Sequence, residues 1–155
     1  MGRDMSNIES ERVTADVQDE VVVFLIGMRI NALWKLHKWL PVFLAMPRML
    51  SELEAHEDSG LLDYRTRWGG RNFEVIQYWR SFEALRGYAH DREAEHLQAW
   101  ADFNRRFRSD GSVGIWHETY LVHEDTYEAV YNNMPPYGLA AATRMVPATG
   151  RRATA

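Results

Sequence analysis

Residues 61–81 read LLDYRTRWGGRNFEVIQYWRS, and this stretch decides the fold. Two runs rich in aromatic and β-branched residues, 61–68 and 71–81, flank the pair Gly69-Gly70. A Gly-Gly pair between two such runs predicts a β-hairpin, because the central residues of a tight turn can require positive φ. The pair is not a phosphate-binding loop, since no helix start follows it. We therefore expect two neighbouring antiparallel strands.

A helix is expected on each side of this hairpin. Over residues 32–56 the apolar residues recur at steps of three and four, which is the period of an amphipathic helix. Pro41 and Pro47 fall inside this helix and are expected to kink or divide it. After the hairpin, Ser81 offers an N-cap and Glu83 a favourable charge for the first turn of a second helix. That helix is predicted to end near residue 110.

Two further strands are expected outside the helices. Residues 21–31 read VVVFLIGMRIN, with apolar residues at every even position, and residues 113–122 are also rich in β-branched and aromatic residues. The resulting order β-α-β-β-α-β is that of a ferredoxin-like unit, an α+β fold. We assign residues 1–20 to a polar N-terminal arm, 21–143 to one ferredoxin-like domain whose C-terminal extension spans 123–143, and 144–155 to a frayed tail.

The composition narrows the classes of function. The 155 residues are 46% hydrophobic and carry a net charge of −4, which allows a sizeable core but not the basic surface of a nucleic-acid-binding protein. The absence of cysteine excludes disulfides and thiolate chemistry and fits a cytoplasmic protein. No export signal is visible, and charged residues interrupt each apolar run before it could span a membrane. We expect a small molecule as partner, with neither nucleic acid nor membrane.

The sheet face turned away from the helices predicts a homodimer. A ferredoxin-like unit has helices on one side only, so its other face needs a cover. That face is expected to carry apolar residues from the first and last strands: Val21, Val23, Leu25, Trp116, Tyr120 and Val122. Because water is a poor neighbour for such a surface, we expect two copies to pack sheet against sheet. The alternative is a monomer in which the C-terminal extension covers this face.

Two histidines are predicted to point into the layer between helices and sheet. At about 100° per residue, His96 falls on the apolar face of the second helix, whereas His90 is turned away. The period of two along the last strand places His117 with Val113, on the side opposite Trp116. The pair forms a candidate site, and the alternative is two core histidines satisfied by hydrogen bonds. Three more histidines are expected at the rim or surface: His37, His56 and His123.

Several longer stretches carry a resemblance to known families. Over residues 21–143 the chain resembles an uncharacterised bacterial family commonly labelled as a domain of unknown function or as monooxygenase-like. The stretches concerned include WKLHKWLPVF, AMPRMLSELEAH and GIWHETY. Over residues 79–138, the stretches EALRGYAHDREAEHLQAW, IWHETYLV and VYNNMPPYGL are similar to the C-terminal part of the haem-containing aldoxime dehydratases.

The second resemblance implies a cofactor and roles for individual residues. By it, His96 would be the axial ligand of a haem b iron, His117 the distal acid or base, and Trp79 and Trp100 contacts of the cofactor. It also implies a dehydratase-like lyase acting on a small N–O substrate such as an oxime. The two fused ferredoxin-like halves of that family would be matched here by a homodimer. No residue of this chain aligns with the family's distal arginine and serine.

Two other functions fit the same pocket. The first is a cofactor-independent monooxygenase or isomerase of the dimeric α/β-barrel type, in which His96 or His117 acts as base on an aromatic or polyketide substrate. The second is a haem-binding or sensing module without turnover. A haem protein is coloured and a cofactor-independent enzyme is not, so colour separates the first of these functions from the haem-binding ones.

Overall fold

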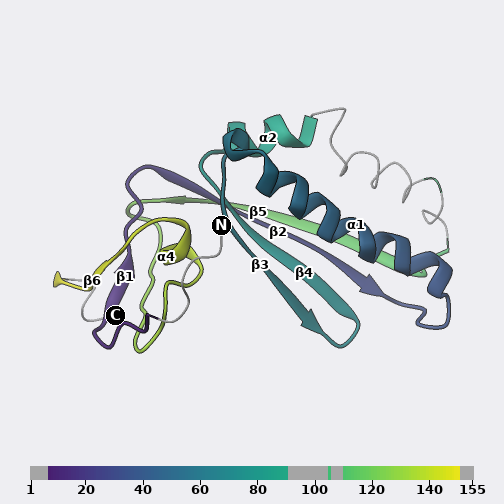
Figure 1. The fold of residues 1–155 in the computed structure, drawn as a ribbon, viewed down its shortest axis with the longest axis horizontal. Helices are drawn as coiled ribbons and strands as arrows, with labels where there is room; N and C mark the ends of the chain where they lie inside the picture. The colour runs from purple at the N-terminus through teal and green to yellow at the C-terminus, as the bar shows by residue number, and fades with distance from the viewer. Residues whose placement is uncertain (1–6, 91–104, 106–109, 151–155) are drawn as a thin grey trace.

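The computed structural model describes residues 7–90, 105 and 110–150. Its main sheet has four antiparallel strands in the order β3-β4-β2-β5 (Figure 1). The elements of this unit are β2 (Glu20–Ile30), α1 (Leu36–Ala55), the 3-10 turn η1 (Glu57–Ser59), β3 (Leu61–Gly69), β4 (Asn72–Trp79), α2 (Phe82–His90) and β5 (Val113–His123). The strand order and the helix placement are those of a ferredoxin-like fold, as the sequence predicts.

The expected hairpin is present, with its turn one residue later than the glycine pair suggests. Gly69 still belongs to β3 and lies opposite Asn72, so the turn residues are Gly70 and Arg71. Gly70 has φ of 59° and Arg71 is not among the residues with positive φ. Positive φ at the first central position alone is the pattern of a type II′ turn, in which glycine takes that position.

The core lies between α1 and one face of the sheet, which we call the inner face. Even-numbered residues of β2 point to this face, as their alternation predicts. Val22 packs with Leu53 of α1 and Trp79 of β4. Further along the sheet, Met28 packs with Val113 of β5. Helix α1 covers the sheet mainly through its second half, where Met46, Met49, Leu50 and Leu53 are buried. The first half of the predicted apolar stripe differs, because Leu36, Leu40 and Leu44 are exposed.

Helix α1 runs unbroken through Pro41 and Pro47, so the prolines do not divide it. Both prolines lie on the exposed side of the helix. Each removes one backbone hydrogen bond, and on an exposed side water can satisfy the released carbonyl. Met46, Met49 and Leu50 hold the helix to the sheet around Pro47, and Trp39, Val42 and Phe43 pack against the core around Pro41.

Helix α2 begins as predicted. The Ser81 hydroxyl accepts a hydrogen bond from the Ala84 N–H at 3.1 Å, which is the N-cap interaction, and Glu83 lies in the first turn. The remainder of the helix expected after His90 falls mostly on residues 91–104 and 106–109, which lie outside the described residues.

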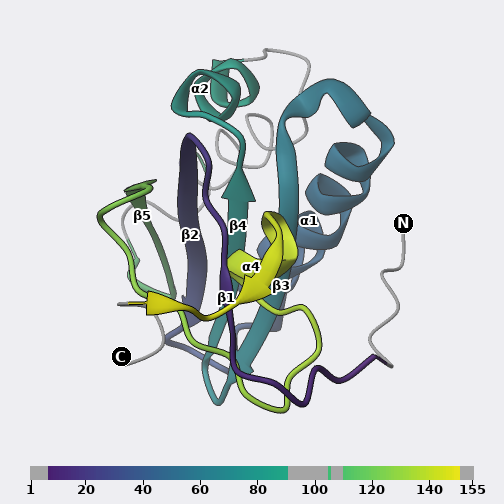
Figure 2. The same ribbon diagram turned by 90° about the vertical axis from the view of Figure 1, so that its left-hand side faces the viewer.

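The two ends of the chain form a second, small sheet. Strand β1 (Val13–Ala15) pairs antiparallel with β6 (Met145–Pro147), and the short helix α4 (Leu139–Ala142) lies just before β6. Figure 1 shows these elements gathered at one end of the main sheet, and Figure 2 views the molecule from that end. The stretches expected to be a polar arm and a frayed tail thus each contain a strand, and β1 is buried.

The C-terminal extension covers part of the sheet's other face, the outer face. The guanidinium of Arg65 lies 3.7 Å from the ring centroid of Tyr137, and its Nη2 donates to the Pro136 carbonyl at 3.4 Å. Gly138 lies beneath Tyr78, where an added Cβ would lie 3.1 Å from the phenol oxygen. These contacts involve β3 and β4 only.

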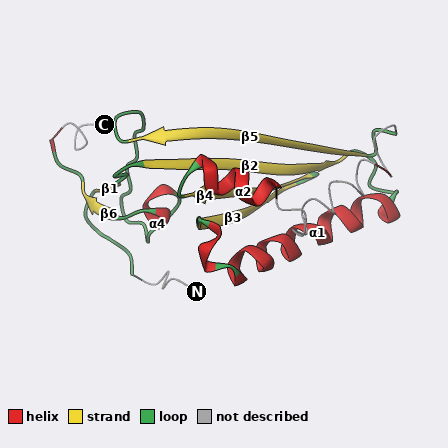
Figure 3. Ribbon diagram, turned by 90° about the horizontal axis from the view of Figure 1, so that it is seen from above, coloured by secondary structure: helices red, strands yellow, loops and turns green. Residues whose placement is uncertain are grey.

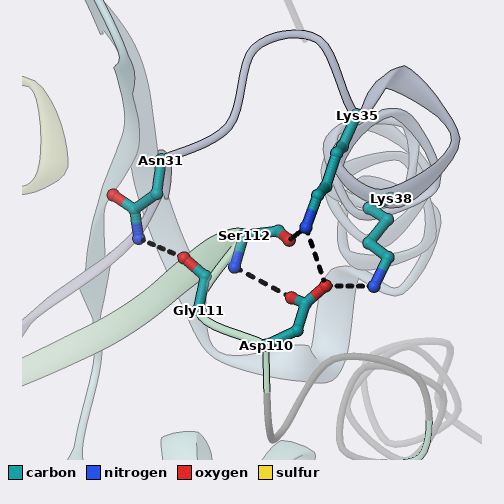
Figure 4. A network of polar contacts seen from close by, with 6 residues as sticks. All are labelled: Asn31, Lys35, Lys38, Asp110, Gly111 and Ser112. Atoms are coloured by element: carbon teal, nitrogen blue, oxygen red, sulfur yellow. Dashed lines mark hydrogen bonds and ion pairs between the residues drawn. The ribbon is translucent and has the colours of Figure 1, made fainter.

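A polar network joins the start of α1 to the start of β5 (Figure 4). Lys35 donates to Asp110 at 3.3 Å and to the Ser112 hydroxyl at 3.2 Å, and Lys38 also donates to Asp110. The Ser112 N–H donates to the other Asp110 oxygen at 2.9 Å. These interactions, with Lys38 first, hold the pKa of Asp110 well below its ordinary value.

We expect Asp110→Asn to lower stability at neutral pH and to lose this effect in acid. The ionised carboxylate is favoured in the folded state, so its contribution is present above the unfolded pKa of about 3.9 and is lost as the pH falls through the lowered folded pKa. Urea unfolding at several pH values from neutral to strongly acidic checks this. A difference between the two proteins that stays constant over that range would contradict the assignment.

Candidate active site

His117 lies on the inner face near the middle of β5, opposite Ile26 of β2. The period of two places it on the same side as Val113, which belongs to the core cluster under α1. Its ring centroid lies 5.8 Å from that of Phe24. The imidazole is exposed in the structure, since β5 is an edge strand. The predicted orientation of His117 toward the helix side is therefore observed.

A row of side chains crosses the inner face beside His117. Strand register places Tyr64, Gln77, Phe24 and Thr119 opposite one another on β3, β4, β2 and β5. Directly opposite residues of antiparallel strands point to the same face and lie about 4.5–5.5 Å apart. Phe24 therefore has the Gln77 amide on one side and the Thr119 hydroxyl on the other. The imidazole of His117 lies in the next row of the same face, opposite Ile26.

Gln77 is a polar residue inside the core, with only 3% of its surface exposed. Its side-chain oxygen accepts a hydrogen bond from the Trp79 indole N–H at 2.9 Å. Because an indole N–H can only donate, this bond fixes the amide so that its oxygen faces Trp79. Among the described residues, no hydrogen bond uses the two N–H donors of the same amide. Polar groups near a core are normally hydrogen-bonded, so these two donors can bond to water or to a bound molecule.

Tyr64, at the far end of the row, cannot serve as a base near neutral pH. Its hydroxyl donates to Glu54 of α1 at 2.8 Å. Burial and this hydrogen bond raise the pKa of Tyr64 to about 12, because both disfavour the phenolate. His117 is therefore the side chain of this group suited to take a proton.

The other predicted site residues have different outcomes. His96 and Trp100 lie outside the described residues, so their roles stay predictions. Trp79 is fully buried and packs against Tyr88, with ring centroids 5.6 Å apart. In the structure it supports the amide of Gln77, and its contact with a cofactor also stays a prediction. The three histidines expected at the rim or surface are exposed: His37, His56 and His123.

Sequence reasoning did not find Gln77. The signal is present in β4, where the inner-face positions read Phe73, Val75, Gln77 and Trp79, with one amide among three apolar residues. Among the described residues, no group of three or more histidine or carboxylate side chains is placed to bind a metal ion. None of the described helices has the length and apolar character needed to cross a membrane.

Comparison with known proteins gives a family and a fold. The family described as Monooxygenase af470-like matches residues 21–139. Monooxygenase af470 of Aspergillus fumigatus is 32% identical over 129 residues, which cover 75% of this chain and 44% of that protein. The family match spans α1, β3, β4, α2 and β5, and all of β2 except Glu20.

Two solved structures are similar to this chain, and the first of them supports the fold. The aldoxime dehydratase OxdRE, in complex with butyraldoxime, has a TM-score of 0.64 at 17% identity, covering 86% of this chain and 43% of its own. SnoaB, a cofactor-independent oxygenase from Streptomyces nogalater, has a TM-score of 0.47 at 11% identity, covering 66% of this chain and 91% of its own. This chain therefore spans less than half the length of both Monooxygenase af470 and the aldoxime dehydratase.

Proposed function

The chain belongs to the Monooxygenase af470-like family, and from this premise we propose that it is a monooxygenase acting on an apolar, aromatic-type substrate, with His117 as general base. The observation that carries the proposal is the inner-face arrangement of an accessible imidazole beside Phe24, with the free amide donors of Gln77 in the neighbouring row. The family favours this function over the haem-dependent lyase that the aldoxime dehydratase resemblance implies.

The side chains suit a reaction in which the substrate itself supplies the electrons. His117 takes a proton from an acidic C–H or O–H of the substrate, and the resulting anion transfers one electron to dioxygen. Recombination forms a C–O bond, and loss of water from the hydroperoxide gives a ketone. A methylene group and O2 thus become a carbonyl and H2O, so no external reductant is required.

Gln77 and Phe24 have separate roles in this scheme. The Gln77 N–H donors would bind the oxyanion that develops on the substrate, where preorganised donors in a site with little water are most effective. The Phe24 ring would pack against the apolar body of the substrate. Trp79 would act as a positioning residue by fixing the Gln77 amide. The haem ligand implied by resemblance, His96, is not among the described residues, and no step of this scheme depends on it.

An absorbance spectrum combined with oxygen uptake tests the proposal. The probe is 1,8-dihydroxyanthrone, an apolar aromatic whose methylene protons are acidic. We expect the purified protein to show no Soret band, to gain none with added haemin, and to consume one O2 per product formed. A Soret band that develops with haemin, together with oxygen uptake only after loading, would support the haem-dependent reading instead.

We also propose that two copies pair through the β2 and β5 part of the outer face. The C-terminal extension contacts β3 and β4, and Val21 at the start of β2 is also buried within one chain, so the alternative of an internal cover holds for these parts of the face. On the uncovered part, the Trp116 ring lies over Gly27, where an added Cβ would be only 2.6 Å from the indole nitrogen. Tyr120, four residues further along the same face of β5, is 53% exposed. This surface suits packing against a second sheet.

Light scattering at micromolar concentration should give a mass of two 18.1 kDa chains. We expect Tyr120→Glu to shift the protein toward monomer, because it places a second carboxylate beside Glu118 at the centre of the interface. Val130→Glu, at another exposed apolar residue, is the matched control and should leave the mass unchanged. A monomeric wild-type protein would contradict the pairing.

A further inference from the structure

Helix α1 presents an apolar surface that the fold does not use. Leu36, Leu40 and Leu44 follow one another at four-residue spacing, so they form a stripe on one side of the helix. Their exposed fractions are 55%, 40% and 46%. Three more exposed apolar residues flank the stripe, and together the six form what we call the α1 patch: Leu33, Trp34, Leu36, Leu40, Leu44 and Trp68.

The α1 patch lies along the β3 edge of the molecule. Phe43 packs edge-on against Trp68 of β3, with ring centroids 5.1 Å apart, and Leu40 and Leu44 adjoin Phe43 on the helix surface. Strand β3 pairs only with β4 among the described strands, and Figure 3 shows α1 running beside it. Lys38 precedes Leu40 by two residues, and two residues turn an α-helix by about 200°. The side of α1 that carries Lys38 and its bond to Asp110 therefore lies nearly opposite the leucine stripe.

The exposure of this surface calls for a partner. Single exposed apolar residues are ordinary, but a contiguous set marks an interaction surface. Trp34 is 77% exposed and Trp68 is 59% exposed, and large aromatic side chains are the costliest to leave in water. Neither the inner-face site nor the outer-face pairing involves these two residues.

The charges closest to the α1 patch are two arginines. Arg48 follows Leu44 at the same four-residue spacing and is exposed, and Arg71 lies in the turn directly after the strand that carries Trp68. Residues 32–51 contain no acidic residue. The other cations of this region do not face the patch: Lys35 and Lys38 bind Asp110 on the opposite flank of α1, and Arg65 and Arg67 lie on the outer face. The charge beside the exposed leucines and tryptophans is therefore positive.

We propose that the α1 patch docks the protein on an anionic lipid surface. Exposed tryptophans favour the level of the lipid headgroups, and a leucine stripe of a surface helix inserts at the acyl boundary. The two neighbouring arginines, Arg48 and Arg71, attract anionic headgroups. The sequence expectation of no membrane partner rests on the lack of a spanning segment, and adsorption of a helix at the surface needs none.

Co-sedimentation with vesicles tests this proposal. The full chain is mixed with vesicles of phosphatidylcholine alone or of phosphatidylcholine and phosphatidylglycerol in equal parts. We expect binding to the mixed vesicles, with a blue shift of tryptophan emission. Leu40→Glu should weaken that binding roughly tenfold or more, because it adds a charge within the inserted stripe. Arg48→Glu should weaken it by several-fold, and added salt should do the same.

Ile8→Glu is the matched control, since Ile8 is also exposed, at 61%, but lies outside the α1 patch. It should bind the mixed vesicles like the wild type. Circular dichroism of each variant confirms that it is folded. Failure of the wild type to bind, or equal binding by Leu40→Glu, overturns the proposal. A third outcome is that the wild type does not bind vesicles and Leu40→Glu changes the oligomeric mass. That result overturns the proposal and indicates that the α1 patch is an interface between copies.

Discussion

Replacing His117 by alanine should lower kcat/KM by about 10²–10⁴-fold, the usual contribution of a general base. The imidazole lies exposed on the inner face and contacts Phe24, so its removal leaves no large cavity. We expect the free energy of unfolding to change by less than about 1 kcal/mol. Steady-state oxygen uptake with the anthrone probe, alongside urea unfolding, measures the two effects separately.

His123→Ala is the matched control for this variant. His123 ends the same strand and is also exposed, with its Nε2 3.9 Å from a Glu20 carboxylate oxygen. It lies outside the row formed by Tyr64, Gln77 and Phe24. We expect it to retain full activity. A His117 variant with activity within a few-fold of the wild type would remove the proposed base from the mechanism.

Replacing Trp79 by alanine should destabilise the protein by about 3–5 kcal/mol, as expected for truncation of a large aromatic residue in a core. Trp79 is fully buried and packs with Val22, Leu53 and Leu85. The change removes these contacts and leaves the Gln77 oxygen without its donor. Urea unfolding measures the loss, and Trp34→Ala, at a residue 77% exposed, should stay within about 0.5 kcal/mol of the wild type.

Trp79→Phe separates packing from positioning. It keeps most of the ring contacts but removes the N–H that orients the Gln77 amide, which costs about 1–3 kcal/mol for the unsatisfied oxygen. If Trp79 positions Gln77, this variant should also raise KM, because the amide no longer has a fixed orientation toward substrate. Loss of stability with unchanged KM and kcat would leave Trp79 as a core residue without a positioning role.

The main sheet and its helices could be predicted because each rests on a long periodic pattern. The alternation in Val22, Phe24 and Ile26 indicates one buried strand face, and Ser81 marks a helix start by the chemistry of its hydroxyl. The hairpin turn was misplaced by one residue because either glycine of the pair can fit a tight turn. In the structure Gly69 ends β3 opposite Asn72, and Gly70 takes the turn position with positive φ.

The rest depended on contacts that a periodic pattern does not reveal. Strands β1 and β6 have three residues each, too few to show alternation, and they form only because the two ends of the chain meet. In the sequence, Gln77 is one polar residue in an apolar run. Only the register of the three strands β2, β3 and β4 shows that it lies beside Phe24. His117 was predicted correctly in its orientation, because strand alternation alone determines the side.

The most direct test of the central claim is turnover of the anthrone probe under ¹⁸O2, with protein that shows no Soret band. We predict one ¹⁸O atom in the new carbonyl group of the product, the other in water, and no labelled product above background from His117→Ala. Labelled product formed equally well by that variant, or turnover only after addition of haemin, would contradict the account.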